Sequence, residues 1–199
     1  ARRGARTRGA TAVGMDAPIL ILGIGNLLWA DEGFGVRAVE ALNARHVFPG
    51  HVRLLDGGTL GLNLVQPVEE ARRLIVFDAI DYGLAPGELK VVCNDAVPLF
   101  MGVKKMSLHQ TGFQEVLGCA RLTGRYPEEL VLIGVQPAVL DDFGGGLSAP
   151  VRAQIGPALA LALEWLARWG VTAVPRQHAA AALGPEVLAD VETVPREKS

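Results

Sequence analysis

The sequence predicts an α/β protein whose mostly parallel β-sheet carries helices on both faces. Three short runs of strand length are separated by stretches in which apolar residues recur at helical spacing, and the first of these runs is apolar and rich in β-branched residues. These runs are residues 19–22, 51–56 and 73–78. Strands that alternate with helices form parallel sheets covered on both sides. We therefore expect the carboxyl ends of the three strands to meet at one edge of the sheet.

The segment that follows the first strand contains the first candidate site residue. Gly23 and Gly25 end the apolar run, and a helical pattern begins after Asp31. We expect Asp31 to be the N-cap of this helix and Glu32 to lie in its first turn. Open α/β sheets bind ligands at the carboxyl ends of their strands, which makes Glu32 a functional candidate. The alternative is that Glu32 only stabilises the positive end of the helix dipole.

Composition and charge exclude several classes of function. A net charge of −2 provides no basic face for nucleic acid, and no run approaches the roughly 20 apolar residues of a membrane span. Gly23 and Gly25 lack the third glycine of a dinucleotide-binding motif, so nucleotide binding is disfavoured. Cys93 and Cys119 form neither a metal motif nor a disulfide framework. A reduced, cytoplasmic setting fits these features best.

The middle of the chain predicts an edge strand and a capped helix. Residues 60–65 predict a short helix that ends at Pro67. Residues 88–93 predict an edge strand that runs antiparallel to the third strand, since a short connection leaves no room for a helical crossover. Residues 94–106 are expected to be irregular. Ser107 and Gln110 then have the spacing of a capping box, and their helix should end near Gly124.

The remainder predicts a fifth strand and a last helix. Residues 130–135 are apolar, and residues 141–146 predict a mobile glycine loop. Ser148 is expected to cap a helix that runs to about Trp169 with a kink at Pro157. We expect one domain over residues 15–175 and a loosely held tail over residues 176–199. Residues 1–14 contain four arginines and no acid, which predicts a disordered or artefactual extension.

Three side chains from separate elements suggest a metal-contacting cluster. If Ser107 is the cap, His109 lies in a first helical turn, where the dipole disfavours imidazolium and leaves the neutral, metal-binding form. Asp78 ends the third strand, and we expect it to converge with Glu32 and His109. Two carboxylates and one imidazole suit a first-row divalent ion with open positions for water or substrate. The alternative is that His109 is a structural residue at a helix start.

Other catalytic arrangements have less support. Asp56 ends the second strand and could form an aspartic-protease pair with Asp78, although the sequence contains no D-T-G motif. There is no G-x-S-x-G motif for a serine nucleophile. We interpret His46, His51 and His178 as structural residues or as residues without a functional role.

Six separated motifs together resemble the hydrogenase maturation endopeptidases. They are residues 23–37, Asp56-Gly-Gly-Thr59, Asp78-Ala79, His109-Gln110, Gly134-Val-Gln-Pro137 and Leu147-Ser148. The resemblance covers about residues 18–175. The form of residues 28–35 is most similar to members that serve membrane-bound uptake nickel–iron hydrogenases.

The resemblance implies a fold, a reaction and a set of site residues. The implied fold is a three-layer α/β/α sandwich with a five-stranded, mostly parallel sheet and one antiparallel strand. The implied activity is an endopeptidase that removes the C-terminal extension of the hydrogenase large-subunit precursor after nickel insertion. Glu32, Asp78 and His109 would contact nickel carried by the precursor, and Asp56 could orient neighbouring groups. Hydrolysis would be metal-assisted or of aspartic type, by a monomer.

Two alternatives come from other functional classes. A non-catalytic, nickel-dependent maturation checkpoint or chaperone would share every one of these features. Peptidyl-tRNA hydrolases have a similar Gly-x-Gly-Asn opening, but no Thr-Arg-His-Asn stretch follows here and the chain is slightly acidic.

Overall fold

The computed structural model describes residues 16–101, 108–181 and 183. The expectations for residues 1–14, for Ser107 as a helix cap and for residues 184–199 lie outside this part of the chain. The proposed division into a domain and two flanking segments therefore stays a prediction. Within the described residues, no helix is long and apolar enough to cross a membrane.

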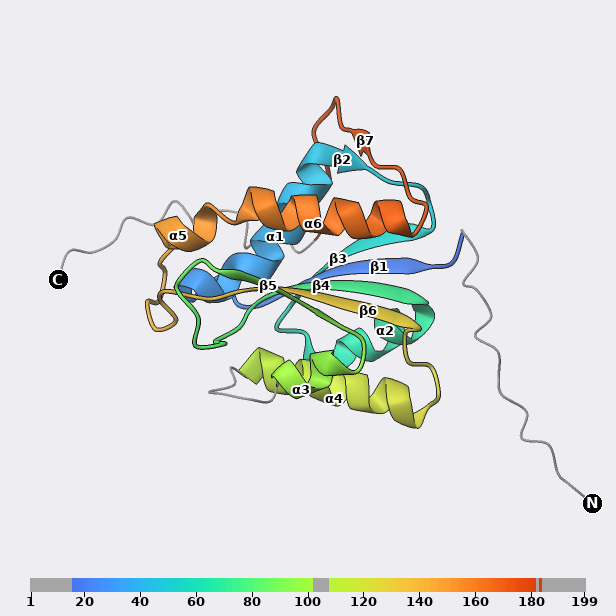
Figure 1. Cartoon of the computed structure of the whole chain (residues 1–199), viewed down its shortest axis with the longest axis horizontal. Helices are drawn as coiled ribbons and strands as arrows, with labels where there is room; N and C mark the ends of the chain where they lie inside the picture. Colours follow the sequence, from blue (N-terminus) through green and yellow to red (C-terminus); the bar gives the residue numbers. More distant parts are fainter. Residues whose placement is uncertain (1–15, 102–107, 182, 184–199) are drawn as a thin grey trace, which may run out of the picture.

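One five-stranded sheet forms the centre of the molecule (Figure 1), and it confirms the predicted fold class. Its strands are β1 (Ile19–Ile24), β3 (Val52–Gly58), β4 (Arg73–Ala79), β5 (Leu89–Cys93) and β6 (Glu129–Val135). They lie in the order β3-β1-β4-β6-β5. The four strands from β3 to β6 are parallel, and β5 is an antiparallel edge strand. Its direction was predicted correctly, but its hydrogen-bonded neighbour is β6.

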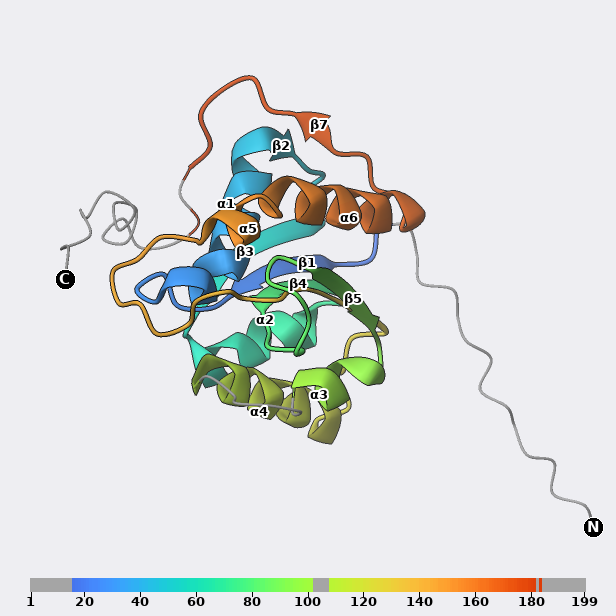
Figure 2. The ribbon, with the colours of Figure 1, turned by 60° about the vertical axis from the view of Figure 1, so that its left-hand side comes forward.

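Helices cover both faces of this sheet (Figures 1 and 2). The helices α1 (Phe34–Arg45) and α6 (Ile155–Arg168) lie on one face, and α2 (Val65–Glu70), α3 (Ala96–Met101) and α4 (Leu108–Leu122) lie on the other. Alternate strand residues enter the two cores: Ile21, Ile75 and Phe77 pack toward α1 and α6, whereas Leu22 and Val76 pack toward α2 and α4. Burial on both faces explains why the strands read as continuous apolar runs rather than alternating ones.

Several helix predictions were wrong in detail, for local reasons. Pro67 lies inside the first turn of α2, where its missing N–H costs no helical hydrogen bond. The segment expected to be irregular contains α3, with Val97 fully buried against the sheet. The segment predicted to be one last helix forms two helices, α5 (Ala149–Arg152) and α6, which a turn at residues 153–154 separates. Pro157 lies near the start of α6 instead of kinking a longer helix.

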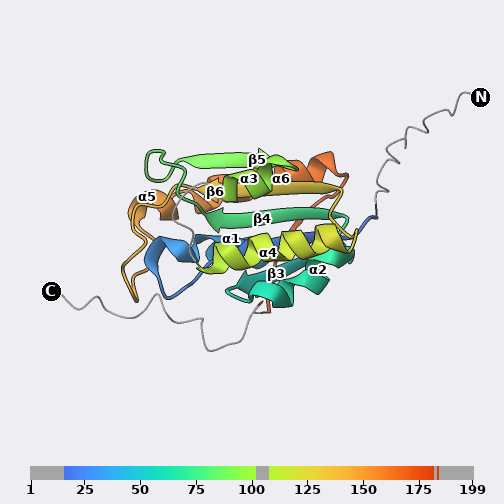
Figure 3. The same ribbon diagram turned by 90° about the horizontal axis from the view of Figure 1, so that it is seen from below.

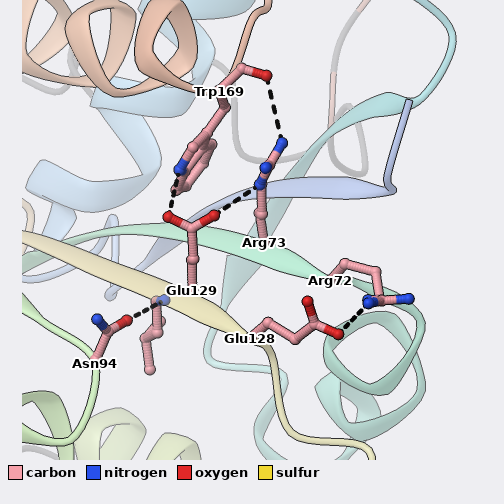
Figure 4. Close-up of polar contacts among 7 residues, drawn as sticks. Arg72, Arg73, Asn94, Glu128, Glu129 and Trp169 are labelled. Atoms are coloured by element: carbon pink, nitrogen blue, oxygen red, sulfur yellow. Dashed lines mark hydrogen bonds and ion pairs between the residues drawn. The ribbon is translucent and has the colours of Figure 1, made fainter. Parts of the chain in front are cut away.

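An ion-paired cluster joins the amino ends of the strands to the end of α6 (Figure 4). Arg73 begins β4 and is 7% exposed; its guanidinium donates to Glu129 Oε1 at 2.9 Å and to the Trp169 carbonyl at 3.3 Å. Glu129, at the start of β6, accepts the Trp169 indole N–H at 2.9 Å. Next to it, Arg72 pairs with Glu128. These contacts fix β4, β6 and the last helix relative to one another.

The chain beyond α6 returns along α1. β7 (Val174–Pro175) pairs antiparallel with β2 (His46–Val47). Arg176 donates from Nε to the Asn43 carbonyl at 2.8 Å, and the Asn43 side-chain amide donates to the carbonyl of Ala181 at 2.8 Å.

The opposite, carboxyl edge of the sheet is where the connecting loops gather. In Figure 3, the loop after β1 and the loop that leads to α5 lie at this edge, and α4 starts beside it. The candidate residues Glu32, Asp56 and Asp78 belong to segments that begin or end at this edge.

Candidate functional site

Close packing of α1 against the sheet places the Glu32 segment at the end of β4. A Cβ at Gly35 would lie 2.2 Å from the carbonyl oxygens of both Ile24 and Phe77, so only glycine lets α1 begin this close to the strands. Gly25 adopts a φ of +140°, and a Cβ there would lie 1.9 Å from the Glu32 carbonyl oxygen. These two contacts hold the backbone of the Glu32 segment against the ends of β1 and β4.

Asp31 is not the N-cap of α1, which corrects the prediction. It lies in a short 3-10 helix, η1 (Ala30–Gly33), and α1 begins afterwards without a side-chain cap. The Asp31 carboxylate is fully buried. Its Oδ1 accepts a hydrogen bond from the Ser148 backbone N–H at 2.7 Å. Its Oδ2 accepts from the N–H groups of Ala138 and Val139 and from the Ser148 hydroxyl at 2.8–2.9 Å.

Ser148 is likewise not the simple helix cap that the sequence predicts. It occupies the N-cap position of α5 but makes no side-chain capping bond to that helix. Its hydroxyl donates to Asp31 instead. The short helix thus begins where the loop from β6 is tied to η1.

Asp78 is a fully buried carboxylate at the end of β4. Its Oδ1 accepts the Ala79 N–H at 2.8 Å. Neighbouring residues of a strand point to opposite faces. Because Phe77 packs toward α1, Asp78 points to the side that α3 and α4 cover.

Tyr82 is a neighbour of Asp78 that sequence reasoning missed. Burial, and to a lesser degree the Asp78 charge, raise the pKa of the Tyr82 phenol above its ordinary value. A Cβ at Gly134 would lie 2.4 Å from the Tyr82 hydroxyl, and Gly134 is the β6 residue in register with Asp78. An isolated glycine inside an apolar strand is a signal of such a close approach.

Gln136 fixes the loop that carries Tyr82. Its side chain is buried at 6% exposure, and its Oε1 accepts the N–H groups of Tyr82 at 2.8 Å and Leu84 at 3.1 Å. Its Nε2 donates to Asp81 Oδ1 at 3.0 Å. The Gln of the Gly134–Pro137 motif is therefore a structural support for the site.

Asp56 lies at the same edge but on the other face. It is in register with Gly23, which is in turn in register with Phe77, so Asp56 lies on the α1 side and Asp78 on the α4 side. The intervening strand β1 separates the two aspartates by two strand spacings, roughly 10 Å. This placement disfavours a direct Asp56–Asp78 pair, since an aspartic-protease dyad needs carboxyl groups about 3 Å apart.

A small cavity adjoins Asp56. It has a volume of about 180 Å³ and is lined by Gly25, Asn26, Leu27, Leu28, Val36, Asp56, Gly58 and Thr59. Burial raises the pKa of the Asp56 carboxyl, and this shift is opposed by the Gly58 N–H, which donates to Oδ1 at 2.9 Å, and by the Arg37 charge. Asp56 therefore holds its proton more tightly than an exposed aspartate does.

His109 is the second residue of α4, and its side chain lies outside the described part of the structure. The first turns of α4 lie at the carboxyl edge, because a Cβ at Gly112 would be 3.2 Å from the Cα of Gly61, just after β3. The backbone thus starts α4 on the face toward which Asp78 points. Among side chains that the structure describes, no three His, Cys, Asp or Glu lie close enough to hold a metal. The cluster of Glu32, Asp78 and His109 stays a prediction.

An exposed aromatic pair borders this edge. The rings of Trp29 and Phe143 meet edge to face with centroids 5.4 Å apart, and their side chains are 37% and 67% exposed. The two residues also form an isolated antiparallel bridge, and Gly144 donates to the Leu28 carbonyl at 2.8 Å. The loop predicted to be a glycine loop is thereby joined to the Glu32 segment.

Comparisons with known proteins agree with the resemblance seen in the motifs. A family model described as hydrogenase maturation protease matches residues 36–165. The hydrogenase expression/formation protein HupM of Azotobacter chroococcum mcd 1 is 66% identical over 176 residues, covering 88% of this chain and 84% of that protein. HoxM of Azotobacter vinelandii is also 66% identical over 176 residues, covering 88% of this chain and 85% of that protein.

A solved structure has the same fold. The hydrogenase maturating endopeptidase HybD from E. coli superposes with a TM-score of 0.76 at 42% sequence identity, covering 80% of this chain and 98% of that one. The predicted family is confirmed: this chain belongs to the hydrogenase maturation proteases.

Proposed function

We propose that this peptidase removes the C-terminal extension of a nickel–iron hydrogenase large-subunit precursor once nickel has been inserted. We further propose that Glu32, Asp78 and His109 contact the nickel that the precursor carries. The observation that carries this proposal is the convergence at one edge: Gly35 packs α1 against the carbonyl of Phe77, beside buried Asp78, and α4 starts on the side toward which Asp78 points.

The chemistry of these three side chains suits a metal that belongs to the substrate. Two carboxylates and one imidazole bind a first-row divalent ion and leave coordination positions open. Without a thiolate, such a set holds the ion modestly, so the nickel would remain with the precursor. Contact with the nickel would fix the nearby chain and place the scissile peptide bond at the carboxyl edge of the sheet.

Hydrolysis adds the oxygen of a water molecule to the peptide carbonyl carbon, and a proton passes to the leaving amine. A nickel-bound or carboxylate-held water is the nucleophile under this proposal. Asp56 lies on the other face of the edge, next to a cavity of about 180 Å³, and we assign it the orientation of neighbouring groups. The unpaired thiols Cys93 and Cys119 accord with a cytoplasmic setting.

Cleavage of a defined precursor tests the proposal. The protein is incubated with nickel-loaded and nickel-free large-subunit precursor, and the products are weighed by mass spectrometry. We expect a shortened large subunit only from the nickel-loaded precursor. His109→Ala and Glu32→Gln should each slow cleavage at least about 100-fold, because each removes a contact to the metal that positions the bond. The matched control is His178→Ala, which replaces an exposed histidine between Arg176 and Ala181, two residues that are hydrogen-bonded to Asn43 in the last turn of α1.

The outcomes separate the alternatives. A protein that binds the loaded precursor without shortening it would be a checkpoint or chaperone rather than a peptidase. If His109→Ala cleaves at the wild-type rate, His109 is structural and the cluster is wrong. Equal cleavage of the nickel-free precursor would show that recognition of the precursor does not require nickel.

A further inference from the structure

The fully buried Asp31 carboxylate joins η1 to two stretches of a loop that is remote in sequence. Ala138 and Val139 lie 107 and 108 residues away, and Ser148 lies 117 residues away. The Asp31 backbone takes part as well, because its N–H donates to the Val139 carbonyl at 3.2 Å. Asp31 is thus bonded to the loop between β6 and α5 through both its side chain and its main chain.

The residue that follows is Glu32, and its backbone is fixed from the other side. The Glu32 N–H donates to the Trp29 carbonyl at 2.8 Å, and the Glu32 carbonyl accepts the Asn26 N–H at 3.1 Å. A Cβ at Gly25 would collide with the same carbonyl. The peptide of Glu32 is therefore held between the end of β1 and the loop to which Asp31 is bonded.

We infer that Asp31 is a positioning residue for Glu32: its four accepted hydrogen bonds set where the Glu32 side chain meets the substrate. This inference rests on the proposed function, in which Glu32 contacts the nickel of the precursor. A carboxylate that accepts only from N–H and O–H donors is specified chemically, because an amide would oppose one N–H with another. All four hydrogen bonds can form together only when η1 lies in this position against the loop.

Helix capping does not explain Asp31, because neither η1 nor α1 has a side-chain capping bond. A second buried polar cluster, formed by Arg73, Glu129 and Trp169, lies at the opposite edge of the sheet (Figure 4). The hydrogen bonds of Asp31 differ from that cluster in their position, because Asp31 lies one residue before a proposed metal contact.

A double-mutant cycle on precursor cleavage tests the inference. Its variants are Asp31→Asn, Glu32→Gln and the pair, measured as kcat and KM below the midpoint of thermal unfolding of the least stable variant. We expect each single change to lower kcat/KM by about 100-fold, since a displacement of about 1 Å has an effect of that size. The double variant should be no more than about threefold slower than either single variant, because both changes remove the same contact between Glu32 and the substrate.

A merely structural role gives a different result. Asp31 would then act independently of Glu32, and the effects of the two changes on kcat/KM would multiply; that result overturns the inference. An Asp31→Asn variant that is folded and cleaves at the wild-type rate overturns it too. The matched control is Glu129→Gln, which weakens the cluster at the other edge and should lower the melting temperature with no change in kcat/KM.

Ser148→Ala keeps the test decisive if Asp31→Asn does not fold. It removes one of the four donors and leaves the three backbone N–H groups in place. We expect kcat/KM to fall about threefold to tenfold in the wild-type background and to stay unchanged when Glu32 is already Gln. An equal fall in both backgrounds overturns the positioning role. A Glu32→Gln variant with wild-type kcat/KM would instead count against the proposed function.

Discussion

Three aspartates lie near one sheet edge, and their surroundings give each a different role. Asp31 is buried and accepts four hydrogen bonds from a remote loop. Asp78 is buried under the α4 side, with the Tyr82 phenol beside it. Asp56 is partly buried on the α1 side, next to a cavity. Aspartate therefore has three different roles here: Asp31 holds a remote loop, Asp78 is a proposed metal contact and Asp56 is a proposed orienting group.

The Asp56 carboxyl gives a pH-dependent prediction. Its folded-state pKa is raised above its ordinary value of 3.8, mainly by burial, so ionising Asp56 destabilises the folded protein. The stability that the protonated form contributes is present below pH 3.8 and is lost as the pH rises through the folded-state pKa. Asp56→Asn should therefore unfold at a higher temperature than wild type at pH 7, and this difference should vanish as the pH approaches 3.8.

Thermal unfolding at several pH values between 4 and 7 measures this difference. The asparagine oxygen can still accept the Gly58 N–H, so the local turn should be kept. Cleavage of the precursor by the same variant should fall about 10–100-fold, as expected for a group that orients others. A variant that is less stable than wild type at pH 7 would show that the Arg37 attraction outweighs burial.

At the scale of the elements, the site depends on how closely α1 approaches the sheet. Gly35 begins the helix against two backbone carbonyls, and Gly23 faces Gly35 from the strand: a Cβ at Gly23 would lie 2.2 Å from the Gly35 carbonyl oxygen. Helix and strand backbones are in contact there without intervening side chains. Because Glu32 lies only three residues before Gly35, a change in the packing of α1 also moves Glu32.

Gly35→Ala tests this dependence. The added methyl group would lie 2.2 Å from the Ile24 and Phe77 carbonyl oxygens, so α1 must move away from the sheet. We expect a loss of about 1–3 kcal/mol of folding free energy, as for other overpacked sites, together with slower cleavage. Thermal unfolding and precursor cleavage on the same sample measure both effects.

The matched control is Gly118→Ala in α4. An added Cβ there meets nothing within 4 Å, and alanine favours a helix over glycine by roughly 0.5–1 kcal/mol. This control should be more stable than wild type and equally active. Equal stability of the two alanine variants would contradict the close contact between α1 and the sheet.

Over the whole molecule, the two edges of the sheet have different roles. The amino edge holds the ion-paired cluster that connects β4, β6 and the end of α6 (Figure 4), and no proposed site residue lies there. The carboxyl edge holds the loops, two glycine-dependent contacts and all the proposed site residues. Changes at the amino edge should therefore lower the stability of the protein without lowering its activity.

Glu129→Gln tests this separation. Losing the negative charge removes the ion pair between Glu129 and the buried guanidinium of Arg73, which should lower stability by about 1–2 kcal/mol. For a domain of this size that corresponds to a melting temperature lower by roughly 2–8 °C. Cleavage below the melting range should be unchanged, and a kcat/KM reduced more than about threefold would contradict the separation of the edges.

The sequence by itself determined the order of the strands along the chain, the coverage of both sheet faces and the family. These features follow from short-range patterns: apolar runs of strand length, helical spacing and turn residues are legible within a window of some ten residues. Asp56 and Asp78 were accordingly placed at the ends of β3 and β4, where the structure has them.

Only the tertiary structure decided which partners those residues have. Asp31 has the sequence context of a helix cap, yet its acceptor oxygens are used by donors more than 100 residues away. Asp56 and Asp78 end neighbouring runs in sequence, but β1 separates them and strand alternation sends them to opposite faces. Hydrogen-bond partners and faces depend on how separate elements pack together, and that information is not contained in any local stretch of the chain.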